Sequence, residues 1–217
     1  LDNAASPRML PAVRRAMEPA LDAVYGNPSS PHRAGREARR TLEDARAKLA
    51  AALGVDPREV VFTSGATEAN HLALLGAAGR GPVAVSAVEH PCVRAAAQRL
   101  EKAGLSVTRL GVDREGRVEP AKLPAGLFLV SVMTVNNETG TIQPLGELQG
   151  RGLLHTDAAQ ALGKVPLPRA DLVTISGHKI HGPKGIGALI ARRGLKIEPQ
   201  LGGGGQEFER RSGTEFV

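Results

Sequence analysis

The chain has 217 residues, of which 41% are hydrophobic and 23% charged, and this composition argues against an intrinsically disordered protein. No apolar run approaches the roughly 18 residues of a membrane-spanning helix, and residues 1–8 lack a basic stretch followed by an apolar one, so neither membrane contact nor a targeting segment is expected. The formal net charge of +6 comes from basic residues interspersed with acidic ones, and only 2% of the residues are aromatic, which argues against nucleic acid as a partner.

Apolar residues recur every three or four positions from Ser30 to Leu53, which predicts a helix that stops at Gly54. Two further helical patterns follow, over residues 69–75 and 91–103. Short apolar or β-branched runs that predict strands lie at residues 60–63, 83–85, 105–110, 127–133, 153–155, 172–175 and 186–190.

Short apolar strands separated by helices favour a mostly parallel sheet covered on both faces, because parallel neighbours need crossover connections. We therefore expect an α/β fold, a three-layer sandwich with a mostly parallel central sheet. No repeat or low-complexity linker divides the chain, and the glycine run at residues 202–205 is the one flexible break. The single cysteine, Cys92, cannot form an internal disulfide, so a reducing, cytoplasmic location is expected.

The first motif with chemical potential is Ser64-Gly65-Ala66-Thr67-Glu68, which follows a predicted strand and opens a helix. Free amides and the dipole at a helix N-terminus bind anions, and glycine lets a phosphate approach the backbone. An ordinary capping box, in which the polar side chains only satisfy the helix end, explains the same residues. Taken alone, the motif favours the capping box.

The second motif is an apolar run that ends in Asp157 and continues to Gln160. An aspartate at the C-terminal end of a parallel strand lies where open α/β sheets bind their ligands. Buried there, its carboxylate can hold a protonated ring nitrogen of a cofactor. The alternative is a helix N-cap, which would be favoured without other motifs.

The third motif is Ser176-Gly177-His178-Lys179, which a predicted buried strand delivers into a glycine-rich turn. Most lysines are solvated surface charges. A lysine desolvated beside cationic or apolar neighbours has a lowered pKa, however, and this suits imine formation. Ser176 and His178 flank Lys179 and can hold a phosphate, while Gly182 and Gly185 allow backbone to approach a flat ligand closely.

Eight sequence blocks lie at residues 1–5, 26–30, 62–68, 89–90, 135–140, 155–160, 176–179 and 211–214. In this order they make the chain similar to the class V branch of fold-type-I pyridoxal-phosphate (PLP) enzymes, and within it to the cysteine desulfurases, which supply sulfur for iron–sulfur clusters. Any one block would be weak evidence, whereas eight in family order are highly specific. The resemblance implies a fold-type-I, PLP-binding large domain over residues 15–217, preceded by a segment, residues 1–14, that packs with a small domain.

The resemblance also implies roles for single residues. Lys179 matches the imine-forming lysine, which also moves protons during catalysis. Asp157 matches the partner of the cofactor's ring nitrogen, and His90 matches the histidine that stacks on the ring. Asn137 and Gln160 match residues near the cofactor's phenolic oxygen, where amide donors tune the ring.

Further matches concern the phosphate, the substrate and the subunit contact. Thr214 matches a residue that binds the phosphate of the neighbouring subunit, which implies a homodimer. Asn27 matches a residue near the carboxylate of the substrate, L-cysteine. No metal is implied. The residues matching the phosphate-binding group of the same subunit are Ala66, Thr67, Ser176, Gly177 and His178.

The chain also departs from the family pattern. Cysteine desulfurases carry a catalytic cysteine on a mobile loop far beyond the PLP lysine, whereas this chain stops 38 residues after Lys179. Cys92 aligns with no family nucleophile, and most of the small domain, with an arginine that clamps the substrate carboxylate, is also missing. We therefore expect the PLP-binding part of a C-terminally truncated cysteine desulfurase, which would convert L-cysteine to L-alanine and serve a sulfur-acceptor or scaffold protein if a thiol is supplied.

Two alternatives stay open at this point. A selenocysteine lyase or another class V aminotransferase-like enzyme shares the lysine and the aspartate and differs around the substrate. A truncated, non-catalytic interaction module would keep the fold but would not take up PLP.

Overall fold

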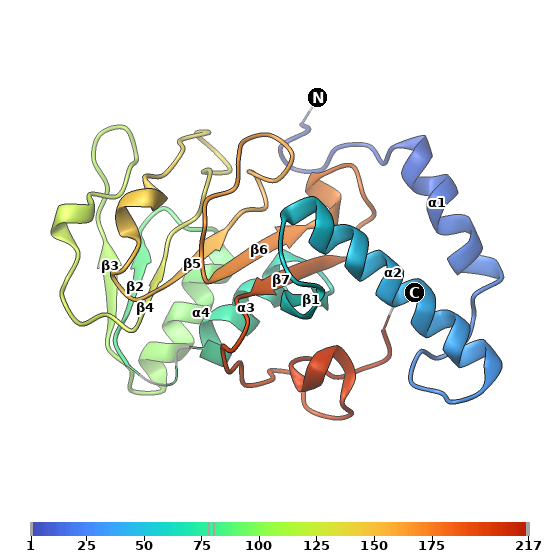
Figure 1. Ribbon diagram of the computed structural model, residues 1–217. Coiled ribbons are helices and arrows are strands. Elements are labelled where there is room, and N and C mark those ends of the chain that lie inside the picture. Colours follow the sequence, from blue (N-terminus) through green and yellow to red (C-terminus); the bar gives the residue numbers. More distant parts are fainter. Residues whose placement is uncertain (1, 78, 80, 216–217) are drawn as a thin grey trace.

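The structure, a computed structural model, describes residues 2–77, 79 and 81–215 (Figure 1). The outer limits of the two predicted domain ranges, Leu1 and Val217, lie outside the described residues. A single seven-stranded sheet has the spatial order β1-β7-β6-β5-β4-β2-β3. The strands are β1 (Val60–Thr63), β2 (Val83–Ser86), β3 (Val107–Leu110), β4 (Leu129–Ser131), β5 (Leu153–Asp157), β6 (Leu172–Ser176) and β7 (Gly187–Ala191).

The sheet is mostly parallel, as predicted. Strands β3, β2, β4, β5 and β6 pair in parallel, and only β7 is antiparallel, to both of its neighbours β1 and β6. In this register Gly187 lies opposite Thr63 on one side and Ser176 on the other. The C-terminal ends of β1, β5 and β6 therefore meet at one edge of the sheet, which is where an open α/β fold binds its ligands.

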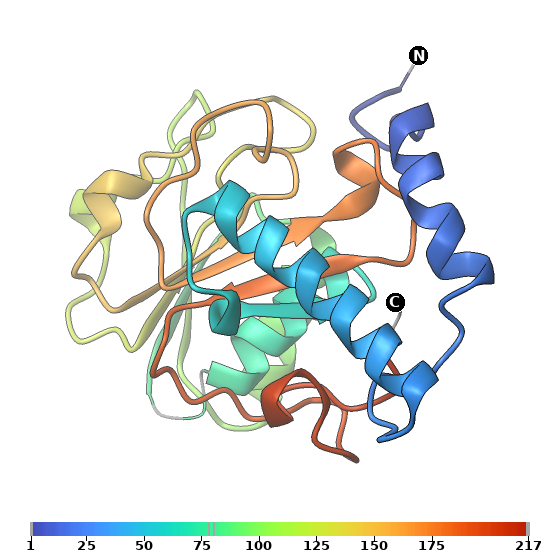
Figure 2. The same ribbon diagram turned by 45° about the vertical axis from the view of Figure 1, so that its right-hand side comes forward.

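Helices cover both faces and make the predicted three layers. Helix α2 (Arg33–Leu53) crosses one face, and α3 (Ala66–Ala77) and α4 (Pro91–Lys102) pack on the other (Figure 1 and Figure 2). The central strands are buried on both sides, whereas the edge strand β3 is partly exposed, and successive residues of a central strand enter different cores. Val83 and Val85 pack in the α3/α4 core, whereas Ala84 between them packs in a core on the opposite face.

A histidine inside the sheet links three neighbouring strands. His155 of β5 is 0% exposed, and its ring nitrogens lie 2.8 Å from the Ser131 hydroxyl of β4 and 3.2 Å from the Thr174 hydroxyl of β6. Burial lowers the pKa of His155 to about 3, so the ring is neutral at physiological pH. His155 is thus a satisfied core histidine that cross-links the strands leading to the site.

The sequence patterns located the strands and three helices well, and they missed one helix. Helix α1 (Pro11–Asp22) has apolar residues at helical spacing, Val13, Met17, Ala20 and Leu21, but it contains Pro19, which normally disfavours a helix interior, and none of its residues is buried. Figure 2 shows α1 at the edge of the molecule, beyond α2. Among the described residues, no helix combines the length and the apolar character needed to cross a membrane.

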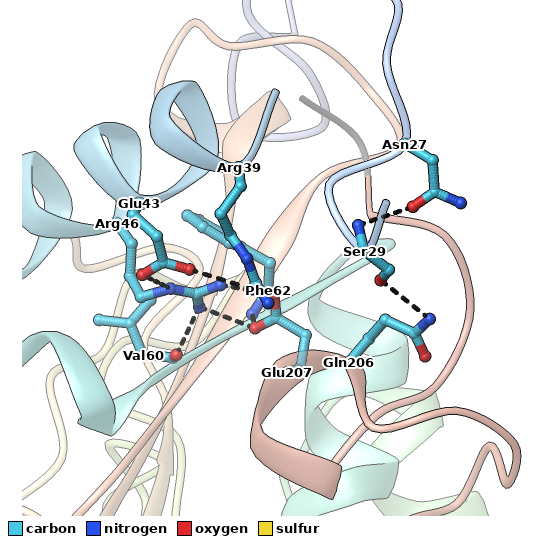
Figure 3. Close-up of polar contacts among 9 residues, drawn as sticks. All are labelled: Asn27, Ser29, Arg39, Glu43, Arg46, Val60, Phe62, Gln206 and Glu207. Atoms are coloured by element: carbon cyan, nitrogen blue, oxygen red, sulfur yellow. Dashed lines mark hydrogen bonds and ion pairs between the residues drawn. The ribbon is translucent and has the colours of Figure 1, made fainter. Parts of the chain in front are cut away.

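A buried ion pair fastens the C-terminal segment to α2. Arg46 donates two hydrogen bonds to the Glu207 carboxylate, of 2.7 and 2.8 Å, and both side chains are 1% exposed (Figure 3). Glu207 also accepts the Phe62 amide at 2.7 Å, and Arg46 donates to the Val60 carbonyl at 2.9 Å. The pair therefore connects α2, β1 and the turn at Gln206–Glu209.

We predict that replacing Arg46 with leucine destabilises the chain by about 3–5 kcal/mol, because Glu207 would be left as a buried charge without its partner. Urea unfolding followed by circular dichroism measures this loss. The control is Arg39→Ala, which removes an exposed ion pair with Glu43 of 3.7 Å and should cost less than about 1 kcal/mol. Equal losses in the two variants would contradict the prediction.

Candidate active site

A cavity of about 580 Å³ opens at the edge where the strand ends meet. Its walls come from the β1–α3 turn, the start of α4, the ends of β5 and β6, and the short 3₁₀ turn Gly177–Lys179. Nine of the residues singled out from the sequence line it: Ala66, Thr67, His90, Asn137, Asp157, Gln160, Ser176, His178 and Lys179.

One wall of the cavity is the N-terminus of α3. The Glu68 side chain reaches back to accept the Ser64 amide at 2.8 Å, so the capping interaction predicted as the alternative is present. The amides of the first helical turn, residues 66–68, have no intrahelical partner by geometry and lie at the cavity wall. The capping interaction uses the Ser64 amide, so it leaves the amides of the first helical turn available to an anion.

The β1–α3 turn is placed by a close approach of two glycines. A side chain at Gly187 of β7 would put its Cβ atom 2.7 Å from the Gly65 backbone. Any larger residue at this position would push the turn away from the strand. The glycine thus sets the position of the α3 N-terminus relative to the ends of β6 and β7.

Asp157 lies at the end of β5, is 6% exposed and lines the cavity. Its Oδ1 accepts the Ala159 amide at 2.9 Å, and its Oδ2 accepts the Asn70 side-chain amide at 2.7 Å. Burial raises the pKa of Asp157, while these hydrogen bonds and the nearby His90 and Lys179 act in the opposite direction. The carboxyl is therefore desolvated but has donors on both oxygens, which suits a group that faces a cationic partner.

Lys179 ends the 3₁₀ turn that follows β6 and is half-buried. Its Nζ donates to the carbonyls of Ala4 and Ala5 at 2.8 and 2.9 Å, so the N-terminal segment closes over this side of the cavity. Burial lowers the pKa of Lys179, with a further contribution from the positive charge of Lys164, while Asp157 opposes the shift. A lysine with a lowered pKa more readily presents the neutral amine needed for nucleophilic attack.

His90 is the N-cap of α4, and it also lines the cavity. Its Nδ1 accepts the Cys92 amide at 3.3 Å and lies 2.9 Å from the Cys92 sulfur. The capping interaction occupies Nδ1, so the neutral ring carries its proton on Nε2. The cap therefore defines the orientation of the ring at the cavity mouth.

Asn137 and Gln160 line the cavity near Lys179. The turn that carries Asn137 is shaped by Asn136, whose side chain accepts the amides of residues 138 and 139 and donates to the Val88 carbonyl. Gln160 donates to the Ala4 carbonyl at 2.7 Å and accepts from Lys164 at 2.9 Å. The Gln160 amide thus sits in a defined position, while for Asn137 these contacts define the backbone of its turn.

Of the residues to which the family resemblance gives a role, three do not line the cavity. Gly177 lies within the 3₁₀ turn, between two residues that do. Asn27 is exposed in the loop before α2, where its Oδ1 accepts the Ser29 amide at 2.8 Å (Figure 3). Thr214 is exposed near the end of the described chain, beyond Arg211, whose guanidinium lies 2.8 Å from Glu68.

The structure adds three residues to which the sequence gave no role. Lys184 lines the cavity from the glycine-rich turn and increases its positive charge. Asn70 of α3 and Glu89, which precedes His90, are 0% and 3% exposed. They do not line the cavity but contact residues that do. Asn70 could have been noticed as a polar residue on the apolar face of a predicted helix, whereas nothing in the sequence marked Lys184.

Glu89 anchors the turn that presents His90. Its Oε1 accepts the Ser86 hydroxyl at 2.9 Å and the Met133 amide at 2.6 Å, which joins the β2–α4 turn to the residues that follow β4. Its other oxygen has no partner among the described residues. Burial raises the pKa of Glu89 to about 8, and the charge of Asp157 adds to this effect.

A comparison with protein families shows that residues 1–215 match the family described as aminotransferase class-V. Among curated relatives, the cysteine desulfurase IscS of Dictyoglomus turgidum is 44% identical over 235 residues, which cover 100% of this chain and 60% of the relative. The putative cysteine desulfurase IscS 1 of Bacillus subtilis is 42% identical, with 100% and 62% covered. The chain spans about 60% of the length of these relatives.

Solved structures show the same fold. A NifS-like protein superposes with a TM-score of 0.94 at 38% identity, covering 99% of this chain and 64% of that one. The structure described as SspA in complex with cysteine superposes with a TM-score of 0.92 at 36% identity, covering 99% and 67%. These structures confirm the predicted fold class.

We predict that the stability of the chain falls as the pH rises from about 4.5 to about 8 because of Glu89. In this window the folded chain keeps the Glu89 proton while the unfolded chain releases it, so the loss reaches at most about 1.4 kcal/mol per pH unit. Glu89→Gln keeps an oxygen acceptor and does not titrate, so it should lack this component. Urea unfolding of both proteins at several pH values measures the difference, and parallel pH profiles would contradict the prediction.

Proposed function

We propose that this chain, which belongs to the aminotransferase class-V family, is the PLP-binding part of a cysteine desulfurase. The complete enzyme would convert L-cysteine to L-alanine and pass the sulfur to an enzyme thiol. Two kinds of support exist, namely the cysteine desulfurases among the relatives and the geometry of the cavity. Because the chain spans only part of these relatives, the activity is proposed for the whole protein.

The observation that carries the proposal is the placement of Asp157 and Lys179 in one cavity whose third wall is the α3 N-terminus. PLP has a ring nitrogen, an aldehyde and a phosphate, and each needs a different partner: a carboxylate, an amine and anion-binding donors. The described residues supply all three types at one site. The donor set therefore fits this cofactor.

The phosphate would be held by the first turn of α3 and by the end of β6. The amides of Ala66 and Thr67 are free of intrahelical partners, and the helix dipole adds a partial positive charge. Ser176, Gly177 and His178 offer further donors from the adjacent turn. This assignment rests on the cavity lining, which contains four of these five residues.

When bound, PLP supplies an aldehyde for covalent attachment and a ring that withdraws electrons from the substrate carbon. The residues of the chain provide the rest. Asp157 would accept a hydrogen bond from the ring nitrogen, and His90 would cover the ring. Lys179 would provide the attachment point and, once free, an amine that can take a proton from the substrate. Asn137 and Gln160 would place amide groups near the phenolic oxygen.

The remaining roles concern parts that the cavity does not include. Asn27 would contribute to binding of the substrate carboxylate, and Thr214 to the phosphate site of a neighbouring subunit in a homodimer. Residues 1–14 would pack with a small domain, and residues 15–217 would form the large domain. The exposure of Asn27 and Thr214 is consistent with groups that act across an interface.

The thiol that accepts sulfur would come from elsewhere in the complete protein or from a partner protein. Cys92 is 8% exposed, and burial raises the pKa of its thiol, with the charge of Asp157 acting in the same direction. Such a cysteine is a poor nucleophile, because the thiolate is the reactive form. The single cysteine also supports a reducing, cytoplasmic location for the enzyme.

We predict that the chain takes up PLP and forms a borohydride-reducible adduct on Lys179, because this amine is half-buried with a lowered pKa. Peptide mass spectrometry after reduction locates the adduct. Lys179→Ala should lose the adduct and the yellow absorbance, whereas Lys184→Ala, on the same turn, should keep the adduct on Lys179. A chain that takes up no PLP would contradict the proposed function and favour an interaction module.

A second measurement tests the reaction. With PLP, L-cysteine and an added small-molecule thiol, we predict alanine formation above a blank that contains PLP without protein. Lys179→Ala should lower the rate at least about 100-fold, because general acid–base catalysis by a positioned group contributes 10²–10⁴-fold. Alanine formation equal to the blank would contradict the predicted activity for this part of the protein.

A further inference from the structure

Asn70 is a fully buried polar residue in an otherwise apolar part of α3. Its side chain is 0% exposed, and its neighbours Ala69, Leu72 and Ala73 all belong to the core between α3, α4 and the sheet. Burying an amide is costly unless its hydrogen bonds are satisfied. The hydrogen bonds of Asn70 should therefore account for its burial.

The hydrogen bonds of Asn70 go to two residues that line the cavity, Asp157 and Cys92. The Asn70 Nδ2 donates to Asp157 Oδ2 at 2.7 Å and lies 3.3 Å from the Cys92 sulfur. The Oδ1 atom of Asn70 has no hydrogen-bond partner in the part of the chain that the structure describes. The residue thus uses its donor and leaves its acceptor unsatisfied, so the contact with the carboxylate is what this side chain provides.

Few other groups near Asp157 can stabilise its ionised form. The titratable groups that act on it or are affected by it are His90 and Lys179, which favour its charge, and Glu89 and Cys92, whose own ionisation is disfavoured by that charge. Lys179 can lose its proton, so its support for the Asp157 charge depends on pH. Asn70 cannot titrate, so its hydrogen bond is independent of pH.

We propose that Asn70 is a positioning residue that orients the Asp157 carboxylate toward the cavity and stabilises its ionised form. With the Ala159 amide on Oδ1 and Asn70 on Oδ2, the carboxylate is held from both sides, and its remaining lone pairs are available to a cationic ligand group. This role rests on the proposed function, in which that ligand group is the ring nitrogen of PLP.

The experiment titrates Asp157 directly in the chain without cofactor. Aspartate labelled with ¹³C at its carboxyl carbon gives one NMR signal per aspartate, and the signal that disappears in Asp157→Asn identifies residue 157. Asn70→Leu has a similar volume, removes the donor and also removes the unsatisfied Oδ1. We expect it to raise the titration midpoint of Asp157 by about one to two pH units, because the lost hydrogen bond favours the charged form.

The matched control is His71→Leu. His71 is the next residue of α3 and makes its own contact with Cys92, at the backbone carbonyl, 3.1 Å away. This variant disturbs the same helix without removing a donor to Asp157, so the midpoint should stay within a few tenths of a unit. If Asn70→Leu does not fold, Asn70→Ala provides the same measurement.

An unchanged midpoint in the Asn70 variant, or an equal shift in His71→Leu, would overturn the proposal. A second measurement uses PLP labelled with ¹⁵N in its ring. The chemical shift of this nitrogen reports whether it is protonated. Asn70→Leu should move this shift toward the unprotonated value. If the unmodified chain binds no PLP, the proposed function fails, while the carboxyl titration still decides the role of Asn70.

Discussion

The burial of the Asp157 carboxylate is the constraint around which the site is organised. A charge-bearing group at the end of a central strand loses its water, and burial alone raises its pKa. The structure offsets this cost with an amide on each oxygen and two basic side chains nearby. To do so it brings together α3, the start of α4 and the turn after β6 at one edge of the sheet.

The same edge also depends on the C-terminal segment. The pair between Arg46 and Glu207 fixes this segment against α2 and β1, and the pair between Arg211 and Glu68 fixes it against the first turn of α3. Glu68 accepts the Ser64 amide as well, so one carboxylate connects the helix cap to the C-terminal segment. The N-terminal end of α3 is therefore held both by its own cap and by Arg211, which is 143 positions from Glu68 in the sequence.

Much of the fold was predictable because it depends on local patterns. The helix ending at Gly54 and the strand before Ser64 were located from apolar spacing, and the structure places them at Arg33–Leu53 and Val60–Thr63. Helix α1 was not predicted although its apolar residues recur at helical spacing, because Pro19 inside it disfavours a helix. The antiparallel direction of β7 was not predicted either, since a buried apolar run reads the same in both directions.

The sequence by itself determined that Asp157 and Lys179 follow buried strands and that a helix opens at the 64–68 motif, because these features depend on residue order over short distances, and the order of its eight blocks determined the family resemblance. Only the tertiary structure decided which side chains support these groups. Asn70 and Asp157 are 87 positions apart, and their contact exists because α3 packs behind the end of β5. Such a contact follows from packing over the whole sheet, which no local pattern of residues records.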